Sequence, residues 1–107
     1  MNIKDGRLSQ IILDLATKFI ETESNRVSLI TVTKVELANR GKLATILFTV
    51  FPDTEEVAVI EFLKRRRSDF RDFVKAKSRI PRIPFFDFMI DLGEKNRQKI
   101  DKLSQQV

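Results

Sequence analysis

The chain has 107 residues, of which 42% are hydrophobic and 33% are charged, and its formal net charge is +5; this composition predicts one globular domain over residues 1–107. It contains no His, Cys, Trp or Tyr, which excludes Cys/His zinc sites, disulfide scaffolds and His-dependent triads, so we expect a protein that is not an enzyme. No apolar run approaches the roughly 20 residues that cross a bilayer and no signal peptide is evident, which predicts a soluble, cytoplasmic protein.

The first predicted element is an amphipathic helix. Its apolar residues recur every three or four positions, at Leu8, Ile11, Ile12, Leu15 and Phe19. This spacing is typical of a helix that packs along one side. A polar cluster at residues 21–25 marks its end.

Two β-branched runs follow, over Val27–Leu37 and Leu43–Phe51, and they predict a pair of antiparallel strands. Gly41 lies between them and can take the positive φ that a hairpin loop requires. In the second strand we expect the even-numbered residues to face the core, namely Ala44, Ile46, Phe48 and Val50.

A second helix is predicted after Pro52, with Asp53 as its N-cap and Glu56 as the capping partner. On a wheel of about 100° per residue, the apolar side chains from Val59 to Val74 fall within an arc of about 120°. A similar arc on the opposite side holds cations, at Lys64, Arg67, Arg71, Lys75 and Arg79. We expect this helix to end just before Lys77.

Arg66 interrupts the apolar arc, where an unpaired guanidinium would be costly to bury. Either its side chain extends out to solvent along its stem, or the helix bends near residues 66–68. The bend is the more economical interpretation, with Ser68 and Asp69 capping the restarted helix.

The positive charge is concentrated in this part of the chain. The nineteen residues from Lys64 to Arg82 carry nine basic and two acidic side chains, a local net charge of +7. The other 88 residues carry eleven basic and thirteen acidic side chains, a net charge of −2. Such an asymmetry indicates a surface that binds a polyanion, most often nucleic acid. The alternative is a solvated helix face without a partner.

A third strand is predicted over Phe85–Asp91, after a segment that its prolines keep extended. Phe86, Phe88 and Ile90 share one face. Asp87 and Asp91 share the other, and we expect them to be exposed carboxylates that keep an edge strand soluble.

A short, loosely docked terminal helix is expected over Glu94–Leu103, with Ile100 and Leu103 as its apolar anchors. The resulting order, α-β-β-α-(kinked α)-β-α, predicts an α+β fold with a three-stranded sheet and the helices on one face. The third strand follows a helical crossover, so it can pair parallel to one of the first two.

Several stretches in this order resemble one known family from about Arg7 to Leu103. They are Ser28–Glu36, Ala44–Val50, Phe70-Arg71, Arg79 and Pro84 before the last strand, Asp91 at its end, and Ile100–Leu103. Together with the element order, they are similar to ribosome-binding factor A.

The resemblance implies a type II K-homology-like topology in which a kink between two helices, usually Ala-x-Gly, replaces the GxxG loop. Arg66-Arg67-Ser68 matches the kink here. The implied function is to bind the immature small (30S) ribosomal subunit and to assist late maturation and processing of its 16S rRNA, notably in the cold. The resemblance also implies assembly GTPases as functional partners, no covalent chemistry and no cofactor. We further expect a monomer without a metal site.

The residues themselves predict that RNA is held through its phosphates, because the planar fork of arginine binds phosphate bidentately. The candidate RNA-binding residues are Lys64, Arg65, Arg66, Arg67, Arg71, Lys75, Lys77, Arg79 and Arg82, with Arg40 and Lys42 at the hairpin tip as secondary candidates. Sequence-specific base stacking is disfavoured: Phe51 and Phe85 could be exposed platforms for a base, but we expect them to pack. Lys34 and Glu36 are expected to form a solvated pair.

Two other classes of function are considered. The basic helix could dock an acidic protein partner, which makes a protein-interaction module the alternative hypothesis. An enzyme such as an RNA nuclease is disfavoured, because the chain has no His and no cluster of carboxylates with metal-ligand spacing.

Overall fold

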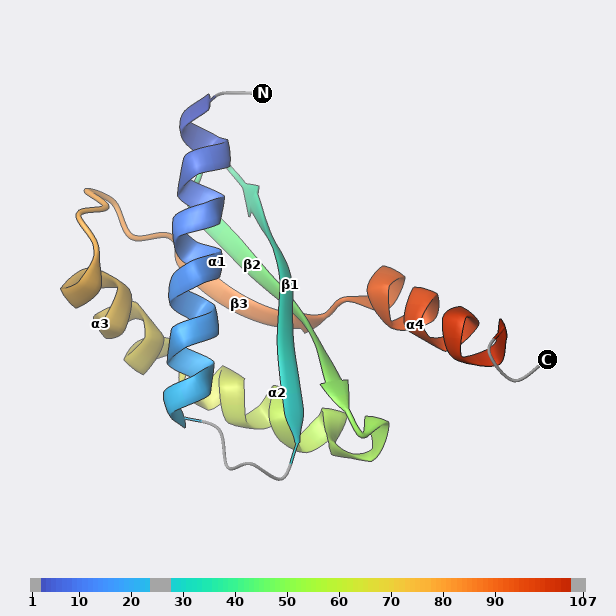
Figure 1. Ribbon diagram of the computed structural model, residues 1–107. Coiled ribbons are helices and arrows are strands. Elements are labelled where there is room, and N and C mark those ends of the chain that lie inside the picture. Colours follow the sequence, from blue (N-terminus) through green and yellow to red (C-terminus); the bar gives the residue numbers. More distant parts are fainter. Residues whose placement is uncertain (1–2, 24–27, 105–107) are drawn as a thin grey trace.

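The computed structural model describes residues 3–23 and 28–104, and its elements follow the predicted order (Figure 1). The helices are α1 (Ile3–Glu23), α2 (Glu56–Arg65), α3 (Arg67–Lys77) and α4 (Leu92–Ser104), with a 3₁₀ turn, η1, over Asp53–Glu55. The strands are β1 (Leu29–Ala38), β2 (Leu43–Phe51) and β3 (Phe85–Ile90). Val27, where the first strand was predicted to begin, lies outside the described residues.

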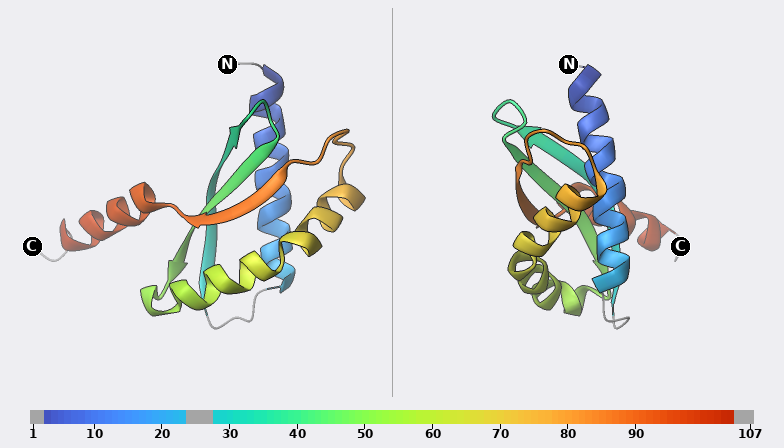
Figure 2. Two further views of the ribbon diagram at one scale, coloured as in Figure 1. Left: turned by 180° about the vertical axis from the view of Figure 1, so that it is seen from behind. Right: turned by 90° about the vertical axis from the view of Figure 1, so that its left-hand side faces the viewer.

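The sheet has the order β1-β2-β3, with β1 antiparallel and β3 parallel to β2. The crossover through α2 and α3 therefore returns the chain to the far edge of β2. Helices α1, α2 and α3 lie on one face of the sheet (Figure 2). This arrangement confirms the predicted α+β fold and decides that the third strand pairs with the second.

The core lies between these helices and the sheet. Ala44, Ile46, Phe48 and Val50 of β2 are buried, as predicted for the even-numbered residues. Phe70 of α3 is fully buried at the centre of an aromatic cluster. Its ring centroid lies 4.6 Å from that of Phe86, 5.2 Å from Phe19 and 5.8 Å from Phe88.

Three consecutive residues of the hairpin between β1 and β2 have positive φ. Gly41 has a φ of 81°, but Asn39 and Arg40 also lie in the left-handed region, with φ of 53° and 58°. Gly41 N donates to Ala38 O at 3.1 Å, which closes a turn around these two residues. Asparagine tolerates this region well, whereas arginine has no such preference.

The prediction that Asp53 caps the second helix is wrong. The chain first tightens into η1, and the backbone N–H of Glu56 then donates to Asp53 O. Backbone carbonyls thus satisfy the N–H groups at the start of α2, and no side chain caps it. Glu56 instead pairs with Lys95 of α4, whose Nζ lies 2.9 Å from Oε2.

The predicted bend is present at Arg66, which has φ −98° and ψ 8°. Arg66 N donates to Leu63 O at 3.0 Å, and Arg66 O accepts from Phe70 N at 2.9 Å, so backbone bonds span the bend. Neither Ser68 nor Asp69 caps α3, contrary to prediction. Ser68 lies within the first turn of the helix, and α3 continues through Lys77, one residue beyond the expected end.

The Arg66 side chain is half-exposed and has partners on three elements. Its Nη1 lies 3.4 Å from Glu23 Oε2 of α1 and 3.1 Å from Asp69 Oδ2 of α3. Its guanidinium carbon lies 5.2 Å from the centre of the Phe62 ring. The bend therefore turns this charge out of the core and toward acidic and aromatic partners.

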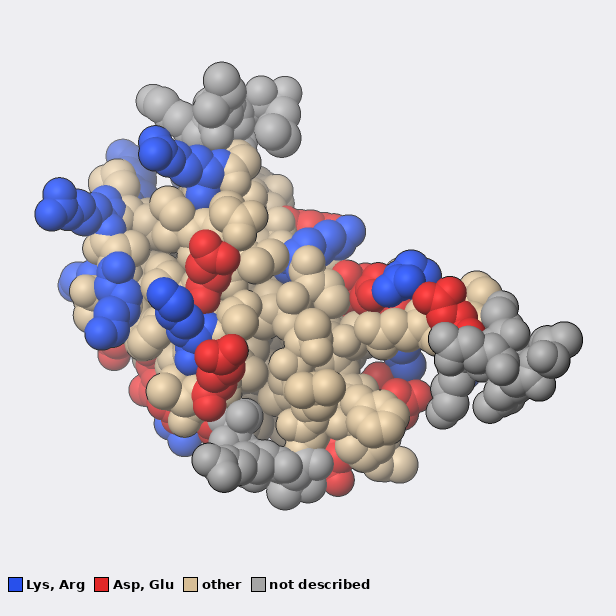
Figure 3. All heavy atoms as spheres, in the orientation of Figure 1, with Lys and Arg blue, Asp and Glu red and all other residues tan. Residues whose placement is uncertain are grey.

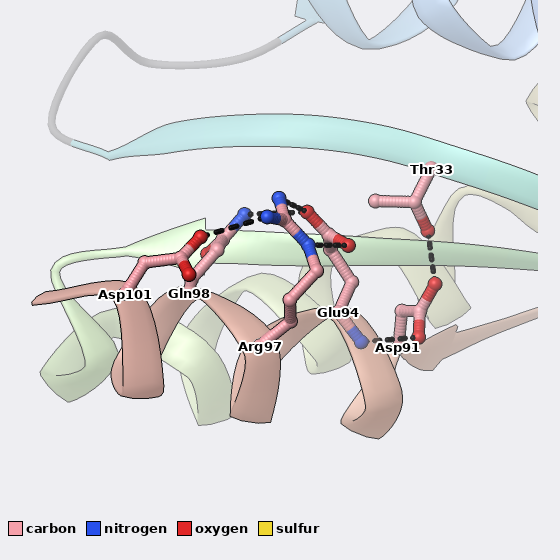
Figure 4. Close-up of polar contacts among 6 residues, drawn as sticks. All are labelled: Thr33, Asp91, Glu94, Arg97, Gln98 and Asp101. Atoms are coloured by element: carbon pink, nitrogen blue, oxygen red, sulfur yellow. Dashed lines mark hydrogen bonds and ion pairs between the residues drawn. The ribbon is translucent and has the colours of Figure 1, made fainter. Parts of the chain in front are cut away.

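Asp91 is not the exposed carboxylate that was predicted, since only 9% of it is exposed. Thr33 interrupts the register of β1, and its hydroxyl donates to Asp91 Oδ2 at 2.6 Å (Figure 4). Oδ1 accepts from Glu94 N at 3.0 Å, so Asp91 caps α4. These bonds, the one from Thr33 most of all, lower the pKa of Asp91.

Helix α4 extends away from the sheet (Figures 1 and 2). Ile100, predicted to anchor it, is 63% exposed, and the side chain of Leu103 lies outside those described. The helix is supported by its own charges instead, as Arg97 pairs with Glu94 and, at 2.8 Å, with Asp101 (Figure 4). Its link to the body is through Asp91 and the Lys95–Glu56 pair.

We expect Asp91→Asn to lower the free energy of unfolding at neutral pH by about 1–2 kcal/mol, because asparagine still caps α4 but loses the charge-assisted bond from Thr33. The folded-state pKa of Asp91 is lowered. Its stabilisation is therefore complete above the ordinary aspartate pKa of about 3.9 and is lost as the pH falls through the folded-state value. Urea unfolding from pH 7 to pH 2 should show the two proteins converging in acid. A constant difference would contradict this account.

Ser68→Gly should lower the free energy of unfolding by about 0.5 kcal/mol, or roughly 2–4 °C in melting temperature, because Ser68 has helical conformation and the bend lies at Arg66. Ser68→Ala is the matched control and should have the opposite effect. Thermal unfolding followed by circular dichroism measures both. A more stable glycine variant would show that the bend requires the small-x-Gly pattern.

Candidate nucleic-acid interface

The predicted cations do not form one continuous stripe. In the view of Figure 3, Lys and Arg side chains gather along the edge formed by α3, the segment after it and the N-terminal part of α1. Acidic side chains are mixed with basic ones over α4. The contacts divide most of the predicted residues into three groups. The bend group is paired and consists of Lys64, Arg66 and Arg67. A second group is exposed on α3, and a third lies at the end of the sheet near the hairpin.

The bend group is partly neutralised by Asp87 of β3. Lys64 Nζ and Arg67 Nη1 each lie 3.5 Å from Asp87 Oδ1. The prediction that Asp87 merely keeps the edge strand soluble is therefore wrong. Asp87 is the counter-charge of two candidate residues. Sequence spacing could not reveal this, because the pairing joins residues on different elements that lie far apart in the chain.

Phe85 is exposed next to the bend group. It is 59% exposed and Phe51 is 67% exposed, so the prediction that both pack is wrong. The guanidinium carbon of Arg67 lies 5.3 Å from the centre of the Phe85 ring. A small hollow of about 250 Å³ lies beside this pair and is lined by Arg67, Ser68, Arg71, Pro84, Phe85 and Phe86. An aromatic face and two guanidinium groups therefore border one depression.

The exposed group on α3 consists of Arg71 and Lys75. Neither forms an ion pair with a described carboxylate. The neighbouring candidates point elsewhere. Arg65 borders a hollow with Ile30 and Phe62 on the β1 side of α2, and Lys77 borders one with Leu15 and Phe73 between α3 and α1.

The remaining candidates meet at the hairpin end of the molecule. Arg40 of the hairpin and Arg79 and Arg82, which follow α3, line one hollow of about 820 Å³. Arg7 of α1 lines it as well and was not predicted, because an isolated cation on the first helix carries no local signal. Lys42 is exposed beside the hollow, and its carbonyl accepts from Phe85 N at 2.8 Å.

The strand pair Lys34–Glu36 is solvated as predicted, with 3.2 Å between Nζ and Oε1. Among the described residues, no group of three or more His, Cys, Asp or Glu side chains is placed to hold a metal ion. Within the same part of the chain, no helix is both long and apolar enough to cross a membrane.

The fold has close relatives among solved structures. The crystal structure of ribosome-binding factor A from Thermus thermophilus superposes with a TM-score of 0.71 at 19% identity, over 79% of this chain and 92% of that one. The solution structure of a Thermotoga maritima protein described as a putative ribosome binding factor A superposes with a TM-score of 0.66 at 21% identity, over 78% of this chain and 83% of that one. A homology model of the Thermus thermophilus factor, fitted into a map of its complex with the 30S subunit, superposes with a TM-score of 0.65 at 18% identity, over 84% of this chain and 93% of that one.

At these identities the likeness shows the fold, which is the K-homology-like fold that the resemblance implied. By sequence, no curated protein matches the chain. The family description ribosome-binding factor A matches residues 4–104, nearly the whole length. The chain therefore belongs to the ribosome-binding factor A family.

Proposed function

We propose that this protein is a non-catalytic assembly factor that binds the 16S rRNA of the immature 30S subunit. The observation that supports it most directly is the exposed face of α3, where Arg71 and Lys75 form no ion pair with a described carboxylate. Arg71 lines the same small hollow as the Arg67–Phe85 pair. Family membership and the 30S complex of the Thermus thermophilus protein point the same way.

The chemistry of this surface suits a folded RNA. Arg71 and Lys75 can contact successive phosphates of a backbone without reading its sequence, and each such contact releases counterions. Phe85 adds an exposed ring against which an unpaired base can stack, with the Arg67 guanidinium on the ring as a second planar group. Recognition would therefore combine backbone shape with one stacking position.

In the absence of RNA, Asp87 forms ion pairs with Lys64 and Arg67. A phosphate that approaches Lys64 and Arg67 has to compete with one carboxylate oxygen, 3.5 Å from each cation. Both pairs are partly exposed, and exposed pairs stabilise a protein by only about 0.2–1 kcal/mol. The competition costs little, so the two cations remain available to RNA.

The proposal includes finer steps that follow from the family rather than from the contacts. The protein would act late in 16S rRNA maturation and processing, including in the cold, as a monomer in the cytoplasm and in functional partnership with assembly GTPases. It would hold an rRNA conformation without covalent chemistry. The alternative is a basic helix that docks an acidic protein.

Sedimentation with separated ribosomal subunits between about 50 and 200 mM salt tests the proposal. We expect the protein to co-migrate with free small subunits and to dissociate steeply as salt rises. Failure to bind them at low salt, or equal binding to large subunits and to heparin, would overturn it.

The double variant Arg71→Glu/Lys75→Glu should bind small subunits more weakly, with a salt slope lower by about 1.5 because roughly 0.7–0.9 of slope is lost with each phosphate contact. Its melting temperature should be unchanged, since both side chains are exposed. Lys99→Glu on α4 is the matched control and should bind like the wild type. A large loss of stability would place these residues on a packed face instead.

Asp87→Asn should raise the affinity for small subunits by about two- to fivefold, as expected when ion pairs worth roughly 0.4–1 kcal/mol no longer compete. Asparagine keeps the Oδ1 acceptor that Phe88 N uses at 2.9 Å, so the strand is preserved. Fluorescence titration at low salt measures the effect. A fall in affinity would mean that Asp87 positions Arg67 for binding rather than competing for it.

A further inference from the structure

A large hollow lies at the end of the molecule opposite the bend of α2 and α3. Its volume is about 820 Å³, within the range of about 300–1,000 Å³ of pockets that hold ligands. Three segments distant in sequence meet there, namely α1 near Arg7, the hairpin tip and residues 78–82. Figure 2 shows these segments converging at one end of the molecule.

The hollow has an apolar floor and a cationic rim. The apolar lining consists of Leu8, Ile11, Ile80 and Pro81, and the cations are Arg7, Arg40, Arg79 and Arg82. No acidic side chain is among the described residues that line it. None of the four arginines forms an ion pair with a described carboxylate, unlike the cations at the bend.

The walls are held in place without a ligand. Ser78 Oγ donates to Val74 O at 2.7 Å and ends α3, and Pro81 and Pro84 restrict the backbone that follows. On the opposite wall the hairpin lies close to α1: a Cβ built at Gly41 would be 3.8 Å from Leu8 Cδ2, an ordinary van der Waals distance. The rim arginines are therefore carried on backbone that contacts within the protein support.

We propose that this hollow is a second RNA contact, which holds an unpaired nucleotide segment with its bases on the apolar floor and its phosphates on the arginine rim. The proposal rests on the function proposed above and adds a distinct site and ligand class to it. A duplex presents its phosphates on the outside and hides its base faces, so it could use the rim but not the floor. An unpaired segment can use both, and arginine planes can also stack on its bases.

Continuity with α3 favours RNA over an acidic peptide as the occupant. Residues 78–82 follow α3 directly in the chain. An RNA strand that extends beyond Arg71 and Lys75 toward the end of α3 would therefore meet Arg79 and Arg82 next. The charge complementarity also extends over three segments, which suits a ligand with one negative charge at each repeating unit. An acidic peptide with apolar side chains remains the competing ligand in the test.

Arg40 allows the test to separate binding from folding. It occupies a left-handed backbone conformation, φ 58°, in which asparagine is favoured over arginine. Arg40→Asn should therefore leave the melting temperature equal or higher while removing one guanidinium from the rim. Lys99→Asn is the matched control, because it removes one exposed cation from α4.

The experiment measures fluorescence anisotropy of a short oligouridylate and of an RNA duplex of equal length over a salt series. Arg40→Asn should weaken oligouridylate binding and reduce its salt slope by about 0.7, the value for one phosphate contact on a single strand. Duplex binding should change less. Ile11→Ser should weaken oligouridylate binding with the slope unchanged, because the floor contacts bases rather than phosphates.

The inference is overturned if the wild type does not bind the oligouridylate, or if Arg40→Asn and Arg79→Gln/Arg82→Gln bind it like the Lys99→Asn control. It is also overturned if these variants bind a peptide of alternating Glu and Leu more weakly but bind the oligouridylate normally. Co-sedimentation of the wild type with small subunits separates the two proposals. If the wild type co-sediments and the variants of the hollow still bind oligouridylate normally, the second contact fails while the proposed function stands.

Discussion

The burial of Phe70 is the constraint on which the arrangement of the basic surface depends. Its ring lies against Phe19 of α1 and against Phe86 and Phe88 of β3, so one side chain joins α3 to both layers of the fold. Full burial of a phenylalanine stabilises a protein by roughly 1.5–3 kcal/mol, and each aromatic pair adds about 0.5–1.5 kcal/mol. No single exposed charge contact of α3 is comparable. Core packing therefore sets the rotation of α3, and Arg71 and Lys75 face solvent as a consequence.

The same packing explains why the bend lies at Arg66. A straight helix would carry the Arg66 guanidinium into the core together with Phe62 and Phe70. The bend lets Leu63 and Phe70 both be fully buried while Arg66 turns toward Glu23 and Asp69. Its φ of −98° is open to any residue, so no small residue is needed at this position. This chain therefore bends at Arg66, with Arg66 and Ser68 at the two positions where the resemblance implied Ala and Gly.

Local patterning was sufficient to predict the elements and the core. The alternation in residues 44–50 identified the buried face of β2, and the wheel of the second helix located both the bend and the exposed cations. The roles of Asp91 and Asp87 were predicted wrongly because partners distant in sequence decide them. Asp91 caps α4 and binds Thr33 across 58 positions, and Asp87 pairs with Lys64 and Arg67. Phe85 is exposed because β3 is an edge strand whose outer face has no covering helix among the described residues.

By itself, the sequence determined the chemistry available to this protein: an excess of cations after residue 63, no histidine or cysteine, and enough periodic apolar residues for one sheet and its helices. Only the tertiary structure decided which cations act together. Asp87 partly neutralises those at the bend, and Arg7, Arg40, Arg79 and Arg82 meet around one apolar hollow. The physical reason is that charges interact through space, and residues far apart in the sequence become neighbours only when the chain folds.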